Sequence, residues 1–101
     1  MTNERIKNKF GHLSKEGRAG LITFLTAGDP DLVISQNLLN SLPQNGADLI
    51  EIGIPFSDPM ADGPVIQASS QRALKAGTTL KKIESIDSQF RTVDNTTPII
   101  L

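Results

Sequence analysis

Three acidic residues lie close together in the segment 51–62: Glu51 stands inside an apolar run, and Asp58 and Asp62 follow in a turn-rich stretch. In a β-strand over 48–54 the side chains would alternate, so Glu51 would point away from the face that carries the isoleucines of this run. An all-isoleucine face must pack against helices. Glu51 is therefore expected to point into the interior of a barrel, if the sheet closes, near the carboxyl end of its strand, where α/β proteins build their active sites.

Glu51 and Asp62 are expected to lie in different environments. A carboxyl in a protein interior is desolvated, which favours its neutral form and makes Glu51 a candidate proton donor and acceptor near neutral pH. Asp62 precedes Gly63 and Pro64 at a predicted helix start, where backbone amides and the helix dipole would keep it ionised. Two such carboxyls would form a pair for acid-base and electrostatic catalysis.

Simpler interpretations of the three acids remain open. Glu51 could be solvated or salt-bridged, Asp62 could be only an N-cap, and Asp58 before a proline could start a turn. The three carboxylates could also bind Mg²⁺, which uses few protein carboxylates and keeps several waters.

Hydrophobic spacing predicts strands that alternate with helices. An amphipathic helix over 3–13 would cover a barrel end or a sheet edge. Strands are expected at 21–25, 48–54 and 97–101, and helices from about 30 to 42, 63 to 76 and 79 to 93. The apolar stripes expected to be buried on the second and fourth helices are Leu32, Leu38, Leu39 and Leu42, and Leu80, Ile83, Ile86 and Phe90. Asp29 is expected only to cap the second helix, with Pro30 in its first position, and Gly77 to end the third.

This alternation predicts an α/β fold with βαβ units, a parallel sheet and right-handed crossovers. Because the last expected strand is apolar and reaches the chain end, residues 1–101 are interpreted as the N-terminal part of one larger domain, with no second domain.

The composition excludes several classes of protein. Ten Lys and Arg stand against eleven Asp and Glu, so the basic surface of a nucleic-acid binder is not expected. Neither a membrane span nor a signal peptide is indicated, and a cytoplasmic location is expected by default.

Two segments resemble the tryptophan synthase alpha chain family. The block 50–64, IEIGIPFSDPMADGP, looks like the signature of that family, and the segment 23–30, TFLTAGDP, resembles its first strand and turn. The resemblance extends over essentially all 101 residues, including the N-terminal helix. Thr23 stands where many members of the family have proline.

The resemblance implies a (β/α)8 TIM barrel that cleaves indole-3-glycerol phosphate to indole and glyceraldehyde 3-phosphate, a retro-aldol lyase step in tryptophan biosynthesis. By the same resemblance, Glu51 would shuttle protons between the glyceryl hydroxyl and indole C3, and Asp62 would steady the indole N–H. Phe24 and Ile66 would line the indole pocket.

The resemblance also implies a partner. The loop that contains Pro55 and Asp58 would face a tryptophan synthase beta chain, in a tetramer of two alpha and two beta chains. Pyridoxal phosphate is expected on the beta chain, whereas the alpha chain itself would use no cofactor and no metal.

The chain supplies only part of this pattern. A complete barrel has eight strands in about 250 residues, whereas the sequence predicts the N-terminal helix and the first βαβαβ portion. The family's phosphate-binding loops and mobile loop follow later strands. The 101-residue chain alone is therefore expected to be inactive and poorly stable, with Leu49 and the inward side chains of the first strand open to solvent. Two alternatives remain: a module that only docks on the beta chain, and another phosphate-binding barrel enzyme.

Overall fold

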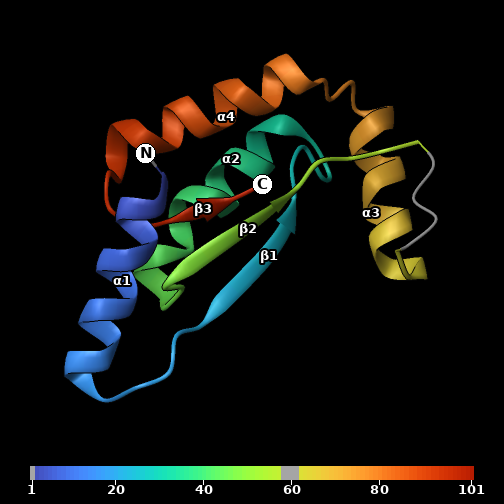
Figure 1. The fold of residues 1–101 in the computed structure, drawn as a ribbon. Helices are drawn as coiled ribbons and strands as arrows, with labels where there is room; N and C mark the ends of the chain where they lie inside the picture. Colours follow the sequence, from blue (N-terminus) through green and yellow to red (C-terminus); the bar gives the residue numbers. More distant parts are fainter. Residues whose placement is uncertain (1, 58–61) are drawn as a thin grey trace.

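The structure, a computed structural model, describes residues 2–57 and 62–101 and contains every helix and strand that the sequence predicts (Figure 1). The first helix continues three residues beyond its expected end. In chain order the elements are α1 (Thr2–Glu16), β1 (Ile22–Thr26), α2 (Leu32–Ser41), the 3-10 turn η1 (Pro43–Asn45), β2 (Leu49–Gly53), α3 (Pro64–Lys75), α4 (Leu80–Val93) and β3 (Ile99–Ile100).

The three strands form one parallel sheet in the order β1-β2-β3. Glu51 is the central residue of this sheet, since it pairs with Phe24 on β1 and with Ile100 on β3. The predicted parallel βαβ arrangement is confirmed.

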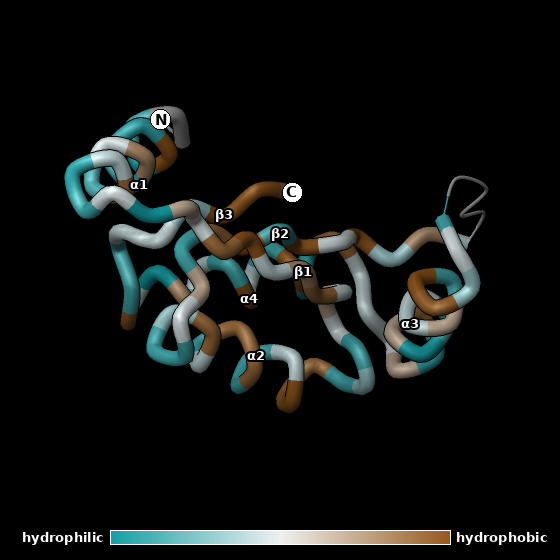
Figure 2. Tube along the Cα trace, turned by 90° about the horizontal axis from the view of Figure 1, so that it is seen from below, coloured by the Kyte–Doolittle hydropathy of each residue, from teal (hydrophilic) through white to brown (hydrophobic). Residues whose placement is uncertain are grey.

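One face of the sheet is covered by α2 and α4 (Figure 2). Ile50 and Ile52 lie in this core, which confirms that the isoleucine face packs against helices, whereas Ile54 lies beyond the end of β2 and is exposed. The buried core residues are Ala27, Leu39, Ala47, Ile50, Ile52, Ile83, Ile86 and Phe90.

Two leucines that were expected to be buried, Leu38 on α2 and Leu80 on α4, are exposed. Leu38 is 47% exposed, and the buried α2 residue beside Leu39 is Ser35, whose hydroxyl oxygen accepts a hydrogen bond from the Gly28 N–H at 2.9 Å. Leu80 lies at the first residue of α4 and is also exposed, because the buried face of that helix begins one turn later.

The first helix lies beside the end of the sheet where the strands begin (Figure 1). Leu13 is buried there, and its side chain lies next to Gly20 and close to the side chain of Leu49. Leu49 is consequently only 1% exposed, so the expectation that it lies open was wrong. Ile22 and Phe24 on the same face are about half exposed, as expected for the first strand.

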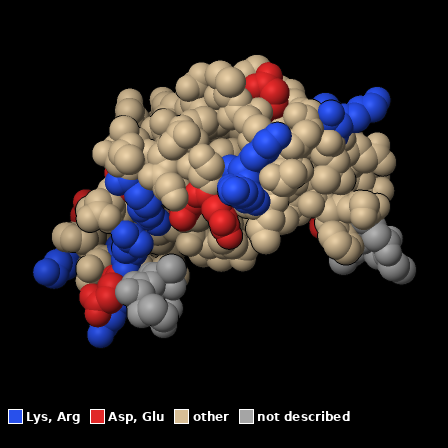
Figure 3. Space-filling model, turned by 90° about the horizontal axis from the view of Figure 1, so that it is seen from above, with Lys and Arg blue, Asp and Glu red and all other residues tan. Residues whose placement is uncertain are grey.

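Charged side chains of both signs are interspersed on the part of the surface seen in Figure 3. Within the described ranges 2–57 and 62–101, no helix has the length and apolar character needed to cross a membrane.

The buried Asp48, which directly precedes β2, forms hydrogen bonds with the segment that connects α1 to β1. The Arg18 guanidinium donates to both carboxylate oxygens of Asp48, at 3.0 and 3.1 Å, and the Leu21 N–H donates to one of them at 2.8 Å. The bonds from Arg18 and from Leu21 lower the pKa of Asp48 below its ordinary value.

Asp48 is expected to make the stability of the chain fall at acidic pH. Its folded pKa lies below the unfolded value of about 3.9, so its stabilisation is present above that pH and is lost as the pH falls through the folded pKa. Asp48→Asn should reduce the free energy of unfolding at pH 7 and flatten its decline below about pH 4, as measured by urea unfolding at several pH values. Glu16→Gln, which removes the exposed partner of Arg18, is the matched control and should reduce the free energy of unfolding much less than Asp48→Asn does. Equal losses for the two variants at pH 7 would contradict this role.

Candidate active site

The middle residues of β1 and β2 bring an aromatic ring and a carboxylate together on the face that α2 and α4 leave open. Glu51 is the central residue of β2 and does not lie near the carboxyl end of the strand as expected. Phe24 and Glu51 are direct neighbours in the parallel register. They line a hollow of about 400 Å³, together with Ile52, Gly53, Ile54, Ile100 and Leu101. Among the residues that the structure describes, Glu51 is the only acid in this lining, so the hollow combines apolar walls with one group that can exchange a proton.

The side chain of Glu51 is exposed in this structure. The expected desolvation is therefore absent, because no element among residues 2–57 and 62–101 covers this part of the open face. Within the same ranges, no salt bridge links Glu51 to another side chain. Of the simpler interpretations, a solvated carboxylate describes this structure and a salt-bridged one does not.

A glycine at the end of β2 leaves room for the Phe24 ring. A Cβ atom on Gly53 would lie 2.5 Å from Phe24 Cζ and 2.9 Å from Cε2, which is closer than carbon atoms approach. Gly53 therefore sets how near the ring lies to β2 and to Glu51. Glycine inside an apolar strand often marks a close approach of another group, and this is the signal that the sequence carries for Gly53.

A second hollow of about 280 Å³ extends from Phe24 toward α3. Phe24 and Ile66, which the family resemblance assigns to one pocket, both line it. The other lining residues are Leu25, Thr26, Asp29, Leu38, Val65, Ser69 and Arg72. The structure thus connects the Glu51 hollow to α3 through the Phe24 ring.

Asp62 lies just before α3 and is exposed. It is not the N-cap: Gly63 occupies that position, and Pro64 is the first helical residue. The backbone carbonyl of Asp62 accepts a hydrogen bond from Gln67 Nε2 at 2.7 Å. The carboxylate of Asp62 lines neither hollow, so the structure does not bring it to Glu51.

Asp29 does not cap α2 as expected. The N-cap is Asp31, whose carboxylate accepts from the Ile34 N–H at 2.9 Å. Asp29 instead forms a two-point ion pair with Arg72 on α3, at 2.8 and 3.1 Å, and this pair raises the pKa of Arg72. Sequence patterns did not reveal this pair, because its two residues are far apart in the chain.

Part of the expected partner loop lies outside the described residues. Pro55 is described and buried, whereas Asp58 falls in the segment 58–61, which the structure does not describe. In the part of the chain that is described, no three acidic, histidine or cysteine side chains gather as a metal site. The Mg²⁺ alternative includes Asp58 and so is not tested.

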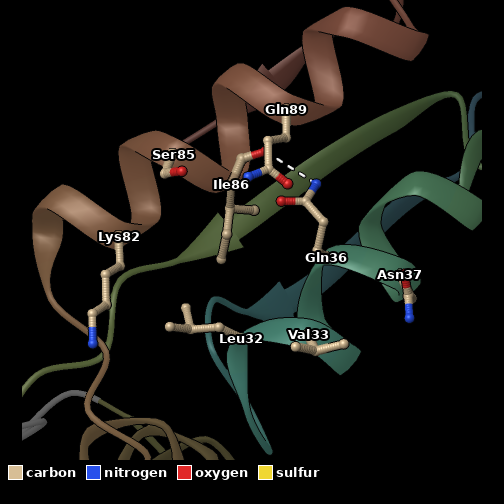
Figure 4. A pocket seen from close by; sticks show the side chains of 8 residues that line it. All are labelled: Leu32, Val33, Gln36, Asn37, Lys82, Ser85, Ile86 and Gln89. Carbon is tan, nitrogen blue, oxygen red and sulfur yellow. Dashed lines mark hydrogen bonds between the residues drawn. The ribbon is translucent and has the colours of Figure 1, made fainter.

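A third hollow, of about 400 Å³, lies between α2 and α4 on the outside of the sheet (Figure 4). Gln36 crosses this groove, and its amide nitrogen donates to the Ile86 carbonyl at 3.2 Å. The one charged lining residue, Lys82, donates to the Gly77 carbonyl at 2.9 Å. Because its lining contains no acid, histidine or cysteine, this groove offers less chemistry than the Glu51 hollow.

The parallel sheet, its outer helices and a carboxylate on the open face match the amino-terminal portion of a (β/α)8-barrel enzyme. A model of the tryptophan synthase alpha chain family matches residues 10–101. The chain belongs to the tryptophan synthase alpha chain family.

Individual relatives agree with this assignment. The chain is 58% identical over 97 residues to the tryptophan synthase alpha chain of Granulibacter bethesdensis and 53% identical over 97 residues to that of Dechloromonas aromatica. Each alignment covers 96% of this chain, and they cover 35% and 36% of the relatives, respectively. The chain therefore spans about a third of the length of these relatives.

Solved structures show the same fold. The tryptophan synthase alpha subunit of Legionella pneumophila superposes with a TM-score of 0.91 at 40% identity, over 94% of this chain and 36% of that one. A tryptophan synthase structure from M. tuberculosis, in an aminoacrylate-bound form, superposes with a TM-score of 0.77 at 34% identity, over 81% of this chain and 34% of that one. These likenesses support the TIM-barrel assignment, of which the described strands are a portion.

Proposed function

We propose that this chain supplies the proton-transfer half of a site that cleaves indole-3-glycerol phosphate to indole and glyceraldehyde 3-phosphate. The observation that carries the proposal is the pairing of Phe24 with Glu51 at the middle of two neighbouring strands, on the open face of the sheet. An indole ring needs an apolar wall, and the retro-aldol step needs a group that gives and takes a proton beside that wall. The hollow along Phe24 offers both.

Glu51 would act on both ends of the bond that breaks. As a carboxylic acid it would deliver a proton to indole C3, and as a carboxylate it would then take the proton of the adjacent glyceryl hydroxyl. The electrons of the carbon–carbon bond would return to the cationic ring, while the hydroxyl carbon becomes the aldehyde. The proton count balances, because the hydroxyl loses one proton and C3 gains one.

Asp62 would act electrostatically. Its carboxylate would accept the indole N–H and stabilise the positive charge that develops on the ring. Asp62 is exposed and directly precedes Gly63, the N-cap of the helix that carries Ile66. Ile66, one turn into α3, would complete the apolar wall opposite Phe24.

The exposure of Glu51 also favours a second function, docking without catalysis. A carboxylate in water lacks the desolvation that would tune it for proton transfer. The 101-residue chain by itself would then bind a beta chain and leave cleavage to a longer chain. Another phosphate-binding barrel enzyme is disfavoured by the family match over residues 10–101.

A chimaera separates catalysis from docking. Residues 1–101 would replace the aligned portion of the Granulibacter bethesdensis protein, to which they are 58% identical. The chimaera should release indole from indole-3-glycerol phosphate, whereas the 101-residue chain should not. A folded chimaera with no cleavage, beside an active parent, would overturn the catalytic proposal.

A beta chain is proposed as the partner, in a tetramer of two alpha and two beta chains. The beta chain would carry pyridoxal phosphate, and the alpha chain would need no cofactor or metal. Pro55 lies two residues after the end of β2, and Ile54 between them lines the Glu51 hollow, so a partner held at Pro55 would lie next to that hollow.

Asp58→Ala in the chimaera should weaken activation by the beta chain without lowering thermal stability. The reason is that the change alters the proposed contact loop and leaves the buried core intact. Titration of cleavage rate against beta chain would measure the effect, with Asp87→Ala on α4 as a charge-matched control. Equal activation of the Asp58→Ala variant and the parent would remove this loop from the interface.

A further inference from the structure

The helix α3 lies apart from the helix layer that covers the sheet. In Figures 1 and 2 it stands beyond the carboxyl ends of the strands, while α2 and α4 lie along the sheet. Its main packing partner is β1, although it follows β2 in the chain. The position of α3 therefore depends on the packing of its buried residues Ser69, Ser70 and Ala73 and on a small number of bonds to the end of β1 and the turn after it.

The first of these bonds is buried. Thr26 Oγ1 and Ser69 Oγ lie 2.7 Å apart, and Ser69 Oγ also donates to the Ile66 carbonyl at 2.8 Å. Ser69 has one hydroxyl proton, which it gives to Ile66, so Thr26 must be the donor in the other bond. A continuous chain of hydrogen bonds thus leads from the end of β1 to the backbone of the pocket residue Ile66.

The second bond lies one turn further along α3. Arg72 Nε and one terminal guanidinium nitrogen contact the two carboxylate oxygens of Asp29, at 2.8 and 3.1 Å. The Arg72 side chain is about half exposed, so the pair adds little to the stability of the chain. A two-point pair does, however, restrict the orientation of both side chains. It would therefore limit rotation and sliding of α3 on β1.

We propose that the Thr26–Ser69 bond and the Asp29–Arg72 pair together form a latch that positions α3, and that these four are positioning residues for the ring pocket between Phe24 and Ile66. The claim that these residues matter for catalysis rests on the proposed function. The claim that they hold α3 in place on β1 does not. Loss of the latch lets α3 move away from Phe24, which widens the hollow of about 280 Å³ that both residues line.

The geometric part is tested in the 101-residue chain itself. The sequence has no cysteine, so Gln71→Cys on α3 and Gln44→Cys in η1 would accept two spin labels without further changes. The parent should give one narrow distance distribution by pulsed electron paramagnetic resonance. Arg72→Gln and Ser69→Ala should each broaden or shift it, and Arg72→Lys, which keeps the charge but not the two-point geometry, should give an intermediate result.

Lys75→Gln is the matched control, because it removes a charge from an exposed residue of the same helix that has no ion pair within the described ranges. Circular dichroism would verify that each variant is folded. If Ser69→Ala unfolds the chain, the exposed Asp29–Arg72 pair still decides the question. An Arg72→Gln distribution identical to that of the parent would overturn the latch.

The catalytic part is tested in the chimaera. Arg72→Gln should lower kcat/KM by ~10-fold to ~10²-fold, mainly through KM, because a displaced pocket wall weakens placement of the ring. The melting temperature should stay near that of the parent. If Arg72→Gln changes the spin-label distance but leaves KM unchanged, the latch positions α3 without affecting the ring pocket, and the catalytic part of the proposal is wrong. An inactive parent chimaera would contradict the proposed function, and the spin-label result would still decide the geometry.

Discussion

Glu51→Gln in the chimaera is expected to slow single-turnover cleavage of indole-3-glycerol phosphate by ~10²-fold to ~10⁴-fold, the usual contribution of a general acid-base group. Glutamine keeps the size and shape of the side chain beside Phe24 but cannot give or take the proton. Substrate affinity and thermal melting should therefore remain close to those of the parent. Rapid-quench detection of indole, with binding measured separately, would resolve the chemical step.

Asp62→Asn is the companion variant and should slow the same step less severely. A neutral amide can still accept the indole N–H bond but cannot offset charge on the ring. If the Glu51→Gln variant turns over within a few-fold of the parent, Glu51 is only a solvated strand residue and the proposed proton transfer is wrong. A larger loss in Asp62→Asn than in Glu51→Gln would exchange the two roles.

Gly28→Ala is expected to unfold the 101-residue chain or to destabilise it by about 2–5 kcal/mol. Gly28 has a φ of +86°, which costs an alanine about 1–2 kcal/mol. A Cβ atom there would also collide with the Oγ1 atom of the buried Thr78, and overpacking of this kind adds about 1–3 kcal/mol. Urea unfolding followed by circular dichroism would give the difference.

Gly17→Ala separates backbone strain from collision. Gly17 also has a positive φ, +68°, but a Cβ atom at that position would meet nothing within 4 Å. Its replacement should therefore cost only the backbone component of about 1–2 kcal/mol. Similar losses in the two variants would show that the Thr78 side chain moves aside freely and that the turn after β1 is not tightly packed.

Local patterns predicted the elements well because each pattern reflects burial against one neighbouring layer. The alternation around Glu51 placed Ile50 and Ile52 on the helix-covered face, and Thr79 does cap α4, accepting from the Lys82 N–H at 3.3 Å. Local patterns could not predict interactions between residues that are far apart in the sequence. Asp29 and Asp31 both lie before α2, but Asp31 caps it, whereas Asp29 pairs with Arg72, which is 43 residues away in the chain.

Local patterns also could not predict which residues of the open face are buried. Leu49 and Glu51 share that face, yet one is buried and the other is in solvent. The difference arises because α1 packs its Leu13 near Leu49, at the beginning of β2, and does not reach the carboxyl end. The alternation of side chains along a strand predicts which face of the sheet a residue lies on. Which element covers each end of that face depends on the rest of the fold.

The order of the strands has a consequence for synthesis on the ribosome. Each strand of the β1-β2-β3 sheet pairs with the strand made just before it, so no pairing has to wait for a distant segment. Each pairing nevertheless closes a connection that contains at least one helix, so it is non-local and slower than the pairing of a hairpin. The order of pairing along the sheet therefore follows the order of synthesis, from β1 at one edge to β3 at the other.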